Sequence, residues 1–344
     1  MSQKPLGIGL VSCGEIAVHH QQAIEKTDEV QVVACMDIHE PVARDMAERC
    51  DCPWFTDLDE LLAQDAVEAV LISTPHWLHA PQTIQAARAG KHVMVEKPIA
   101  TREEDALDMI RECRQADVRL STVFFERGNN HVIKARDLVQ GGAIGRVCLI
   151  TMFGLGHKKQ SYWEGGFTGR VQTDWRQSKE KAGGGFLIMN FVHNIDRMRF
   201  VTGMEADTVF ADYDTFATDV EVEDAIVATI RYENSALGAV VGTTFAAGGG
   251  VQSDVIIGTK GQIKIGNPLQ VYLSEPAGDL KAGEWLEIPC EKNDPRVALL
   301  KDFADAVRTG RDPAITGEDG LATLRICLAA YEAGAKQAPV TLAP

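Results

Sequence analysis

The chain has 344 residues, of which 45% are hydrophobic and 24% are charged, and its formal net charge is −15 at pH 7. This composition is typical of a globular protein long enough for two domains, and the acidic charge argues against nucleic acid as a partner, because phosphate binding requires a basic surface. No apolar run approaches the ~20 residues of a membrane span, and the start lacks the apolar stretch of a signal peptide. We therefore expect a cytoplasmic protein with no membrane partner.

The first 123 residues alternate short apolar runs with helical patterns. Runs rich in Val and Ile predict strands at Leu6–Val11, Val30–Met36, Val67–Thr74, His92–Val95 and Val118–Phe124. A helix follows the first strand, and others are predicted at Pro41–Arg49, Leu58–Ala63, Ala80–Ala89 and Glu103–Ala116. Repeated strand–helix units indicate an α/β Rossmann domain, built on a doubly wound parallel sheet, over residues 1–123.

Residues 124–344 predict an α+β domain of a different kind. A helix at Asn130–Gln140 and a strand from Arg146 precede the irregular, glycine-rich residues 154–185, which we interpret as a binding or covering loop. A helix near Leu187–Val201 then leads into a large, mostly antiparallel open sheet, with strands at Val209–Thr215, Val222–Tyr232, Leu237–Phe245 and Asp254–Ile257. Two final helices, Pro295–Thr309 and Gly317–Ala335, can pack back on the first domain.

Unusual residues follow the predicted parallel strands at their carboxyl ends, where such sheets bind ligands. The segment Ser12-Cys13-Gly14-Glu15-Ile16-Ala17 matches the dinucleotide fingerprint G-x-G-x-x-G, with serine at the first glycine and alanine at the last. Gly14 allows a pyrophosphate to approach the backbone at a helix N-terminus. Asp37 ends the second strand and suits an acid that binds the ribose 2′-OH of NAD and repels the 2′-phosphate of NADP. We expect NAD; an ordinary tight turn and a helix-capping aspartate are the alternatives.

The eight cysteines include no Cys-x-x-Cys pair, and no histidine follows them at zinc-finger spacing. Cys50 and Cys52 are too close in sequence to form a comfortable bridge. We interpret the cysteines as reduced, mostly buried apolar side chains, and we predict no metal site.

Four ordered sequence blocks together resemble the glucose-fructose oxidoreductase / inositol dehydrogenase / rhizopine catabolism (Gfo/Idh/MocA) family of oxidoreductases. The blocks are Gly9–His20, Ser73–Ala80, Ala89–Pro98 and Gly183–Asp196. The resemblance covers almost the whole chain. It implies an N-terminal nucleotide domain and a C-terminal sheet that forms homodimers or homotetramers.

The same resemblance implies roles for individual residues. Lys97, in the family's Glu-Lys-Pro motif, would be the active-site lysine, and His193 the active-site histidine. Met189 stands where family members often carry an aspartate, whereas Asn190 matches a subgroup with Asn-x-x-His. The cofactor-binding residues expected from the strand ends and the motifs are Ser12, Cys13, Gly14, Glu15, Ile16, Asp37, Ser73, Thr74, Pro75, His79, Glu96 and Lys97.

The predicted chemistry is hydride transfer from a substrate alcohol while a base takes the hydroxyl proton. A histidine suits the base, since its ordinary pKa of about 6.5 lies near working pH, and Lys97 would stabilise the reacting oxygen. Without the resemblance, His193 reads as a helix histidine with a satisfied hydrogen bond and Lys97 as a solvated loop lysine. In the loop 154–185, the expected substrate contacts come from Tyr162, Trp175 and Arg176, beside those of Lys97, Asn190 and His193.

The sequence therefore predicts an NAD-dependent enzyme that oxidises a secondary hydroxyl of a sugar, an inositol-like polyol or a sugar acid. Three alternatives stay open: an NADPH-dependent keto-sugar reductase, a hydrolase or epimerase that recycles tightly bound NAD, and a non-catalytic sensor of sugar or NAD. Retention of both Lys97 and His193 disfavours the sensor, because sensing requires no proton chemistry.

Overall fold

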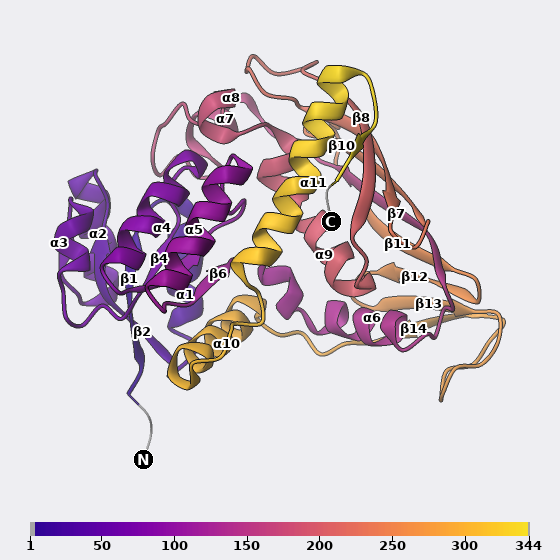
Figure 1. The fold of residues 1–344 in the computed structure, drawn as a ribbon, viewed down its shortest axis with the longest axis horizontal. Coiled ribbons are helices and arrows are strands. Elements are labelled where there is room, and N and C mark those ends of the chain that lie inside the picture. The colour runs from indigo at the N-terminus through magenta and orange to yellow at the C-terminus, as the bar shows by residue number, and fades with distance from the viewer. Residues whose placement is uncertain (1–3, 343–344) are drawn as a thin grey trace. The chain divides into compact units, whose positions relative to one another are not determined.

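A computed structural model describes residues 4–342 of the chain (Figure 1). Packing divides the chain into two units. Within residues 4–342, unit 1 comprises residues 4–125, 161–183 and 296–324, and unit 2 comprises residues 126–160, 184–295 and 325–342. Among residues 4–342, no helix combines the length and hydropathy needed to cross a membrane.

Unit 1 is built on a six-stranded parallel sheet of order β3-β2-β1-β4-β5-β6. Its strands are β1 (Leu6–Val11), β2 (Val30–Met36), β3 (Trp54–Phe55), β4 (Ala69–Ile72), β5 (His92–Val95) and β6 (Leu120–Thr122). Its helices are α1 (Glu15–Ile24), α2 (Glu40–Cys50), α3 (Leu58–Leu62), α4 (His79–Arg88), α5 (Glu103–Gln115) and α10 (Pro295–Thr309). All residues of β1 and β4 are buried, as the continuous apolar runs predict for central parallel strands. The predicted Rossmann fold is confirmed.

Unit 2 is built on a nine-stranded sheet of order β14-β13-β12-β11-β7-β10-β9-β8-β15. Its strands are β7 (Val147–Leu155), β8 (Ala206–Asp214), β9 (Ala225–Tyr232), β10 (Leu237–Thr243), β11 (Gln252–Gly258), β12 (Gly261–Ile265), β13 (Leu269–Leu273), β14 (Trp285–Ile288) and β15 (Val340–Thr341). Apart from the parallel pair β7–β10, the strand pairs are antiparallel. This confirms the predicted mostly antiparallel sheet, although β12 to β15 were not predicted.

Helices α6 (Asn130–Gln140) and α9 (Val192–Thr202) pack together beside this sheet (Figure 1). Buried and exposed residues alternate strictly along β9, so the other face of the sheet is open at this strand. A long helix, α11 (Gly317–Lys336), begins in unit 1 and ends in unit 2.

Two local expectations hold only in part. Residues 154–185 are not wholly irregular, because β7 runs to Leu155 and two short helices follow, α7 (Gln160–Gly165) and α8 (Lys179–Ala182). The helix predicted near Leu187–Val201 begins with a π-helical turn, Leu187–Phe191, and becomes an α-helix only at Val192. Such turns change which face of a helix a side chain occupies, here just before His193.

Candidate active site

The turn between β1 and α1 has the backbone that the dinucleotide fingerprint requires. Ser12 occupies the left-handed region with φ of 73°, a conformation that glycine adopts without strain. Its N–H donates to the carbonyl of Met36 at 2.8 Å, and its carbonyl accepts from Ser73 Oγ at 3.3 Å. These bonds hold Ser12 in the left-handed conformation. Because glycine adopts this conformation without strain, the fingerprint has glycine at this position.

Helix α1 begins directly after this turn. Its N-cap is Gly14, and no side chain caps the helix. A Cβ placed on Gly14 would meet only Ser12 Oγ, at 3.6 Å, so the protein itself leaves room there. An uncapped helix N-terminus beside open space is the arrangement that binds a pyrophosphate.

Asp37 is buried at the end of β2 and organises the same turn. Its Oδ2 accepts the N–H of Cys13 at 2.8 Å and Ser12 Oγ at 3.4 Å, whereas its Oδ1 accepts the N–H of His39 at 2.9 Å. The carboxylate thus joins the β1–α1 turn to the start of α2. Asp37 therefore has a structural role in the cofactor loop in addition to the predicted ribose contact.

The loop 161–183 folds against this turn within unit 1. Arg170 donates through Nε to the carbonyl of Cys13 at 2.9 Å and through Nη2 to Asp45 Oδ2 at 2.5 Å. The N–H of Phe167 donates to Glu15 Oε2 at 2.9 Å. Arg170 was not among the predicted site residues, because its partners lie far away in sequence.

Lys97 follows β5, next to a buried acid. The Glu96 side chain contacts His20 Nε2 at 2.7 Å through Oε1 and accepts the N–H of Lys97 at 3.1 Å through Oε2. Glu96 and His20 are both buried, whereas Lys97 is half-buried. Glu96 therefore fixes the backbone that carries the lysine.

His79 holds the other side of the Lys97 turn. Its Nδ1 lies 2.8 Å from the carbonyl of Pro98, and its Nε2 lies 2.9 Å from the carbonyl of Thr74. Thr74 Oγ1 in turn donates to Gln82 at 2.7 Å. The ends of β4 and β5 are thus tied together through one buried imidazole.

His76 links these strand ends to the loop 161–183. Its Nδ1 lies 2.8 Å from the carbonyl of Ala182, and its ring centroid lies 4.5 Å from that of Trp175. Burial, followed by the charges of His79, Lys97 and Arg176, holds the pKa of His76 well below its ordinary value. Burial likewise lowers the pKa of His79. Both imidazoles are therefore neutral near pH 7.

Arg176 stacks on two aromatic side chains of the loop. Its guanidinium carbon lies 4.6 Å from the ring centroid of Trp175 and 5.3 Å from that of Tyr162. Trp175 and Arg176 are half-buried, but only 7% of Tyr162 is exposed. The Tyr162 ring packs against Phe167 at 4.8 Å, so most of its surface is used within the loop.

In unit 2, His193 and Asn190 lie on consecutive helical segments. Asn190 lies within the π-helical turn, where Lys158 Nζ donates to its Oδ1, and Met189 beside it is buried. His193 is half-buried in the first turn of α9. Lys158 is a second residue that the sequence did not single out; its position in the basic loop after β7 was the available signal.

Helix α9 is held in place by charged contacts on its other residues. Asp254 of β11 accepts from Asn194 at 3.1 Å and from Arg197 at 3.0 Å. Asp196 accepts from Arg127 at 2.6 to 3.1 Å in a buried, multiply hydrogen-bonded ion pair. These contacts fix the helix that carries His193.

The predicted site residues divide between the two units. All of the expected cofactor residues lie in unit 1, and so do Tyr162, Trp175 and Arg176, whereas Asn190 and His193 lie in unit 2. Within unit 1, the β1–α1 turn, Asp37, Ser73, Thr74 and Glu96-Lys97 follow the carboxyl ends of adjacent parallel strands. That edge can bind a dinucleotide, and Lys97 places a cation beside it.

Comparisons with known proteins agree with this geometry. A model described as "Oxidoreductase family, NAD-binding Rossmann fold" matches residues 6–124, and one described as "GFO/IDH/MocA C-terminal domain" matches residues 132–264. The chain is 31% identical to 1,5-anhydro-D-fructose reductase of Ensifer adhaerens over 81% of each chain. It is 29% identical to myo-inositol 2-dehydrogenase of Thermotoga maritima over 94% of each.

Among solved structures, the WlbA dehydrogenase of Bordetella pertussis in complex with NADH and UDP-GlcNAcA has a TM-score of 0.85. It is 26% identical to this chain, and the match covers 99% of each chain.

Proposed function

Because the chain belongs to the GFO/IDH/MocA family of oxidoreductases, we propose that it oxidises a secondary hydroxyl of a sugar, an inositol-like polyol or a sugar acid, with NAD as the hydride acceptor. The observation that carries the proposal is the strand edge of unit 1, where an uncapped helix N-terminus, a buried Asp37 and Lys97 stand at the ends of adjacent strands. The relatives named as a sugar reductase and an inositol dehydrogenase support the substrate class.

The residues of this edge fit a dinucleotide. The first N–H groups of α1 would hold the pyrophosphate, and the Asp37 carboxylate would bind the ribose 2′-OH and disfavour a 2′-phosphate. When bound, the nicotinamide supplies the hydride acceptor. The loop 161–183 would fix the adjacent backbone through Arg170, which donates to the carbonyl of Cys13.

Lys97 and His193 would share the handling of the proton. The Lys97 ammonium would donate a hydrogen bond to the substrate oxygen and stabilise its developing negative charge. His193 would accept the hydroxyl proton as general base. His76 and His79 are unsuited to carry a charge, since burial lowers the pKa of both.

Trp175 and Arg176 would bind the substrate. A half-buried indole offers an apolar face to a sugar ring, and a guanidinium beside it offers paired donors to hydroxyls or a carboxylate. Tyr162 would act mainly by packing under Arg176. In an Arg176→Ala variant we expect a higher KM for the best substrate, and an unchanged KM would remove Arg176 from this role.

The test of the function is nicotinamide reduction followed by absorbance. NAD and NADP are offered separately with aldoses, inositols, polyols and aldonic or uronic acids. Lys97→Ala should lower kcat by about 10²- to 10³-fold, the usual effect of removing an oxyanion donor. Lys91→Ala is the matched control, because Lys91 precedes the same strand and its ammonium bonds the carbonyl of Val67 at 2.7 Å.

The proposed role of His193 as general base is tested separately, by the pH dependence of kcat/KM. In the wild type, kcat/KM should rise with pH as the general base loses its proton. His193→Asn should lower kcat by about 10²- to 10⁴-fold and abolish this rise. His131→Asn, on α6 of the same unit, is the control, and a retained pH profile in His193→Asn would refute the assignment of the base.

A second candidate is reduction of a keto-sugar with NADPH. The relative named 1,5-anhydro-D-fructose reductase favours it. The same residues would act in reverse, with Lys97 polarising the carbonyl. NADPH oxidation by a keto-sugar, with no NAD reduction by any alcohol in the panel, would select this candidate. Turnover without added coenzyme or net NADH would instead indicate recycling of bound NAD.

We further propose that the protein is a homodimer or homotetramer joined through the C-terminal sheet. The support is an apolar set of exposed side chains on its strands, including Phe210, Val227 and Leu237, which are 37%, 56% and 47% exposed.

We also propose the division into domains 1–123 and 124–344. The packing units differ from it by assigning residues 124–125, 161–183 and 296–324 to unit 1.

A further inference from the structure

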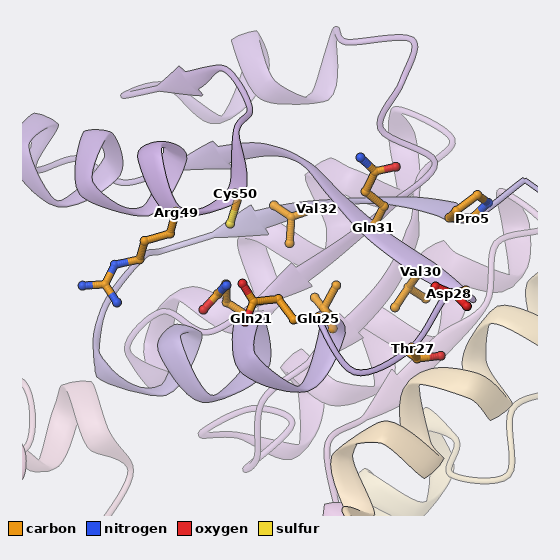
Figure 2. A pocket seen from close by; sticks show the side chains of 11 residues that line it. Pro5, Gln21, Glu25, Thr27, Asp28, Val30, Gln31, Val32, Arg49 and Cys50 are labelled. Atoms are coloured by element: carbon orange, nitrogen blue, oxygen red, sulfur yellow. The ribbon is translucent and has the colours of Figure 1, made fainter.

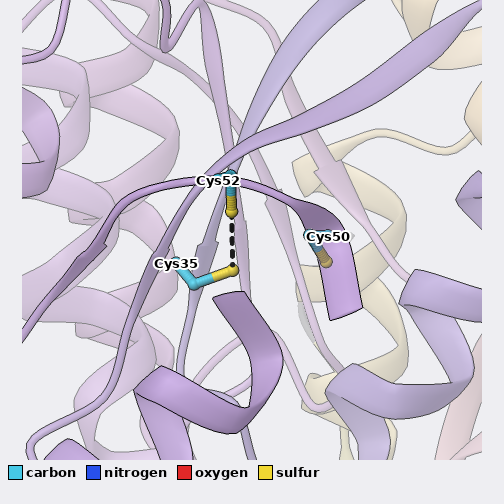
Figure 3. A group of neighbouring side chains, drawn as sticks. All are labelled: Cys35, Cys50 and Cys52. Carbon is cyan, nitrogen blue, oxygen red and sulfur yellow. Dashed lines mark hydrogen bonds between the residues drawn. The ribbon is translucent and has the colours of Figure 1, made fainter. Parts of the chain in front are cut away.

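Three cysteines of unit 1 come together at the β2–α2–β3 corner (Figure 3). Cys35 lies in β2, Cys50 is the last residue of α2, and Cys52 precedes β3. Their sulfur atoms all lie within 4.8 Å of one another, and the Cys35 and Cys52 sulfurs are 3.5 Å apart. All three are free cysteines.

The local backbone explains how residues 15 to 17 positions apart in sequence converge. Asp51 caps the C-terminus of helix α2, and its φ of 51° reverses the chain. The N–H of Cys52 then donates to the carbonyl of Ala47 at 3.2 Å, and the N–H of Cys35 donates to the carbonyl of Pro53 at 3.0 Å. The thiols are thus carried by a hydrogen-bonded scaffold.

The spacing matches a thiolate metal site. Two sulfurs bound to one Zn²⁺ at about 2.3 Å lie about 3.8 to 4.0 Å apart in tetrahedral or trigonal geometry. The observed separations, from 3.5 Å to at most 4.8 Å, bracket that value. Small side-chain rotations would therefore bring three ligands to one ion.

The site also has an entry path. Cys50 lines a cavity of about 300 Å³ bounded by α1 and β2 (Figure 2), and Arg49 lines it too. Cys50 and Cys52 are half-buried, whereas Cys35 is buried.

We propose that Cys35, Cys50 and Cys52 bind one thiophilic d¹⁰ ion, Zn²⁺ or Cu⁺, with an open coordination position toward the cavity. Soft thiolate ligands select these ions over Mg²⁺ or Ca²⁺. Binding replaces the thiol protons, so affinity falls as pH falls. The ion would cross-link β2, the end of α2 and the segment before β3, and its ligand Cys35 lies two residues before Asp37.

The experiment uses the full-length protein, reduced and stripped with a chelator. Zn²⁺ and Cu⁺ are titrated separately against chromophoric chelators, and Co²⁺ is used to detect thiolate-to-metal absorption. We expect one ion per chain and a melting temperature raised on the order of 5 °C at saturating metal.

Cys50→Ser and Cys52→Ser are the test variants, since both thiols are half-buried and serine is nearly isosteric. Each should lose more than about 100-fold in affinity, beyond what changes outside the ligand set usually cause. Cys290→Ser is the control, because Cys290 is equally half-buried but lies outside the cluster. Circular dichroism of the stripped variants checks their folding.

The proposal is overturned if the wild type binds less than one ion, or if Cys50→Ser and Cys52→Ser bind it as tightly as Cys290→Ser does. It is also overturned if Co²⁺ binds without thiolate-to-metal absorption, because another donor set would then be responsible. Both readouts are independent of dehydrogenase activity.

Discussion

Replacing Asp37 with asparagine separates two roles that this carboxylate combines. In its structural role, it accepts the N–H groups of Cys13 and His39 at 2.8 and 2.9 Å. In its proposed role, it discriminates NAD from NADP by charge. Asparagine keeps the shape, removes the charge, and has only one oxygen with which to accept these two donors.

The magnitude of each effect follows from the geometry. Two unit charges about 4 Å apart near a protein surface interact by about 4 kcal/mol, and tenfold in an equilibrium corresponds to 1.4 kcal/mol. Removing the charge should therefore raise the ratio of kcat/KM for NADP to that for NAD by roughly 10- to 1000-fold. One buried N–H left unpaired should also lower the free energy of unfolding by about 1 to 3 kcal/mol.

Initial rates with each coenzyme and urea unfolding measure the two effects separately. Glu48→Gln, an exposed acid on α2, controls for the loss of one negative charge. If Asp37→Asn is destabilised but its coenzyme ratio equals that of Glu48→Gln, Asp37 serves only the turn. Specificity for NAD would then require another cause.

Three further predictions concern unit 2. Asp196→Ala should lower the free energy of unfolding by about 3 to 5 kcal/mol in urea, because it leaves Arg127 buried without its ion pair; a loss no larger than that of the exposed Asp137→Ala would contradict this. Burial raises the pKa of Glu223 from 4.5 to about 7, so the folded state retains this proton at higher pH than the unfolded chain does. The free energy of unfolding should therefore fall by about 3 kcal/mol as the pH rises from 4.5 to 7. That decline should be absent from urea unfolding of Glu223→Gln, and an identical pH slope would refute it. Val227→Glu, on the exposed face of β9, should reduce the light-scattering mass to the 37.4 kDa monomer, whereas Val251→Glu, in a loop, should not; an unchanged mass would exclude this face as the interface.

Continuous apolar runs made the central strands predictable. β1, β2 and β5 have the predicted bounds, because parallel strands buried on both faces contain little except Val, Ile and other apolar residues. The two-residue β3 and the short strands β12 to β15 have no such run. Their pairing depends on neighbouring strands, which a local pattern does not contain.

The contacts of the candidate site were less predictable, because they join residues far apart in sequence. Arg170 lies 157 positions from Cys13, and its guanidinium is no different in sequence from any other in a basic loop. The cysteine cluster arises from a left-handed residue at Asp51, which places Cys52 beside Cys35. The sequence motifs predicted the β1–α1 turn and Lys97 as site elements. The contacts that support these elements could be identified only from the tertiary structure.

The charges around Lys97 constrain where the substrate proton can go. His76 and His79 are both buried, and the nearby cations Lys97 and Arg176 further oppose a positive charge on His76. A proton on either ring would be destabilised by burial and by the positive charges nearby. At the strand edge of unit 1, Lys97 is a cation that can contact the reacting oxygen, whereas His76 and His79 are poorly suited to hold the proton. We therefore propose His193 as the base, and the pH profile of His193→Asn tests this assignment.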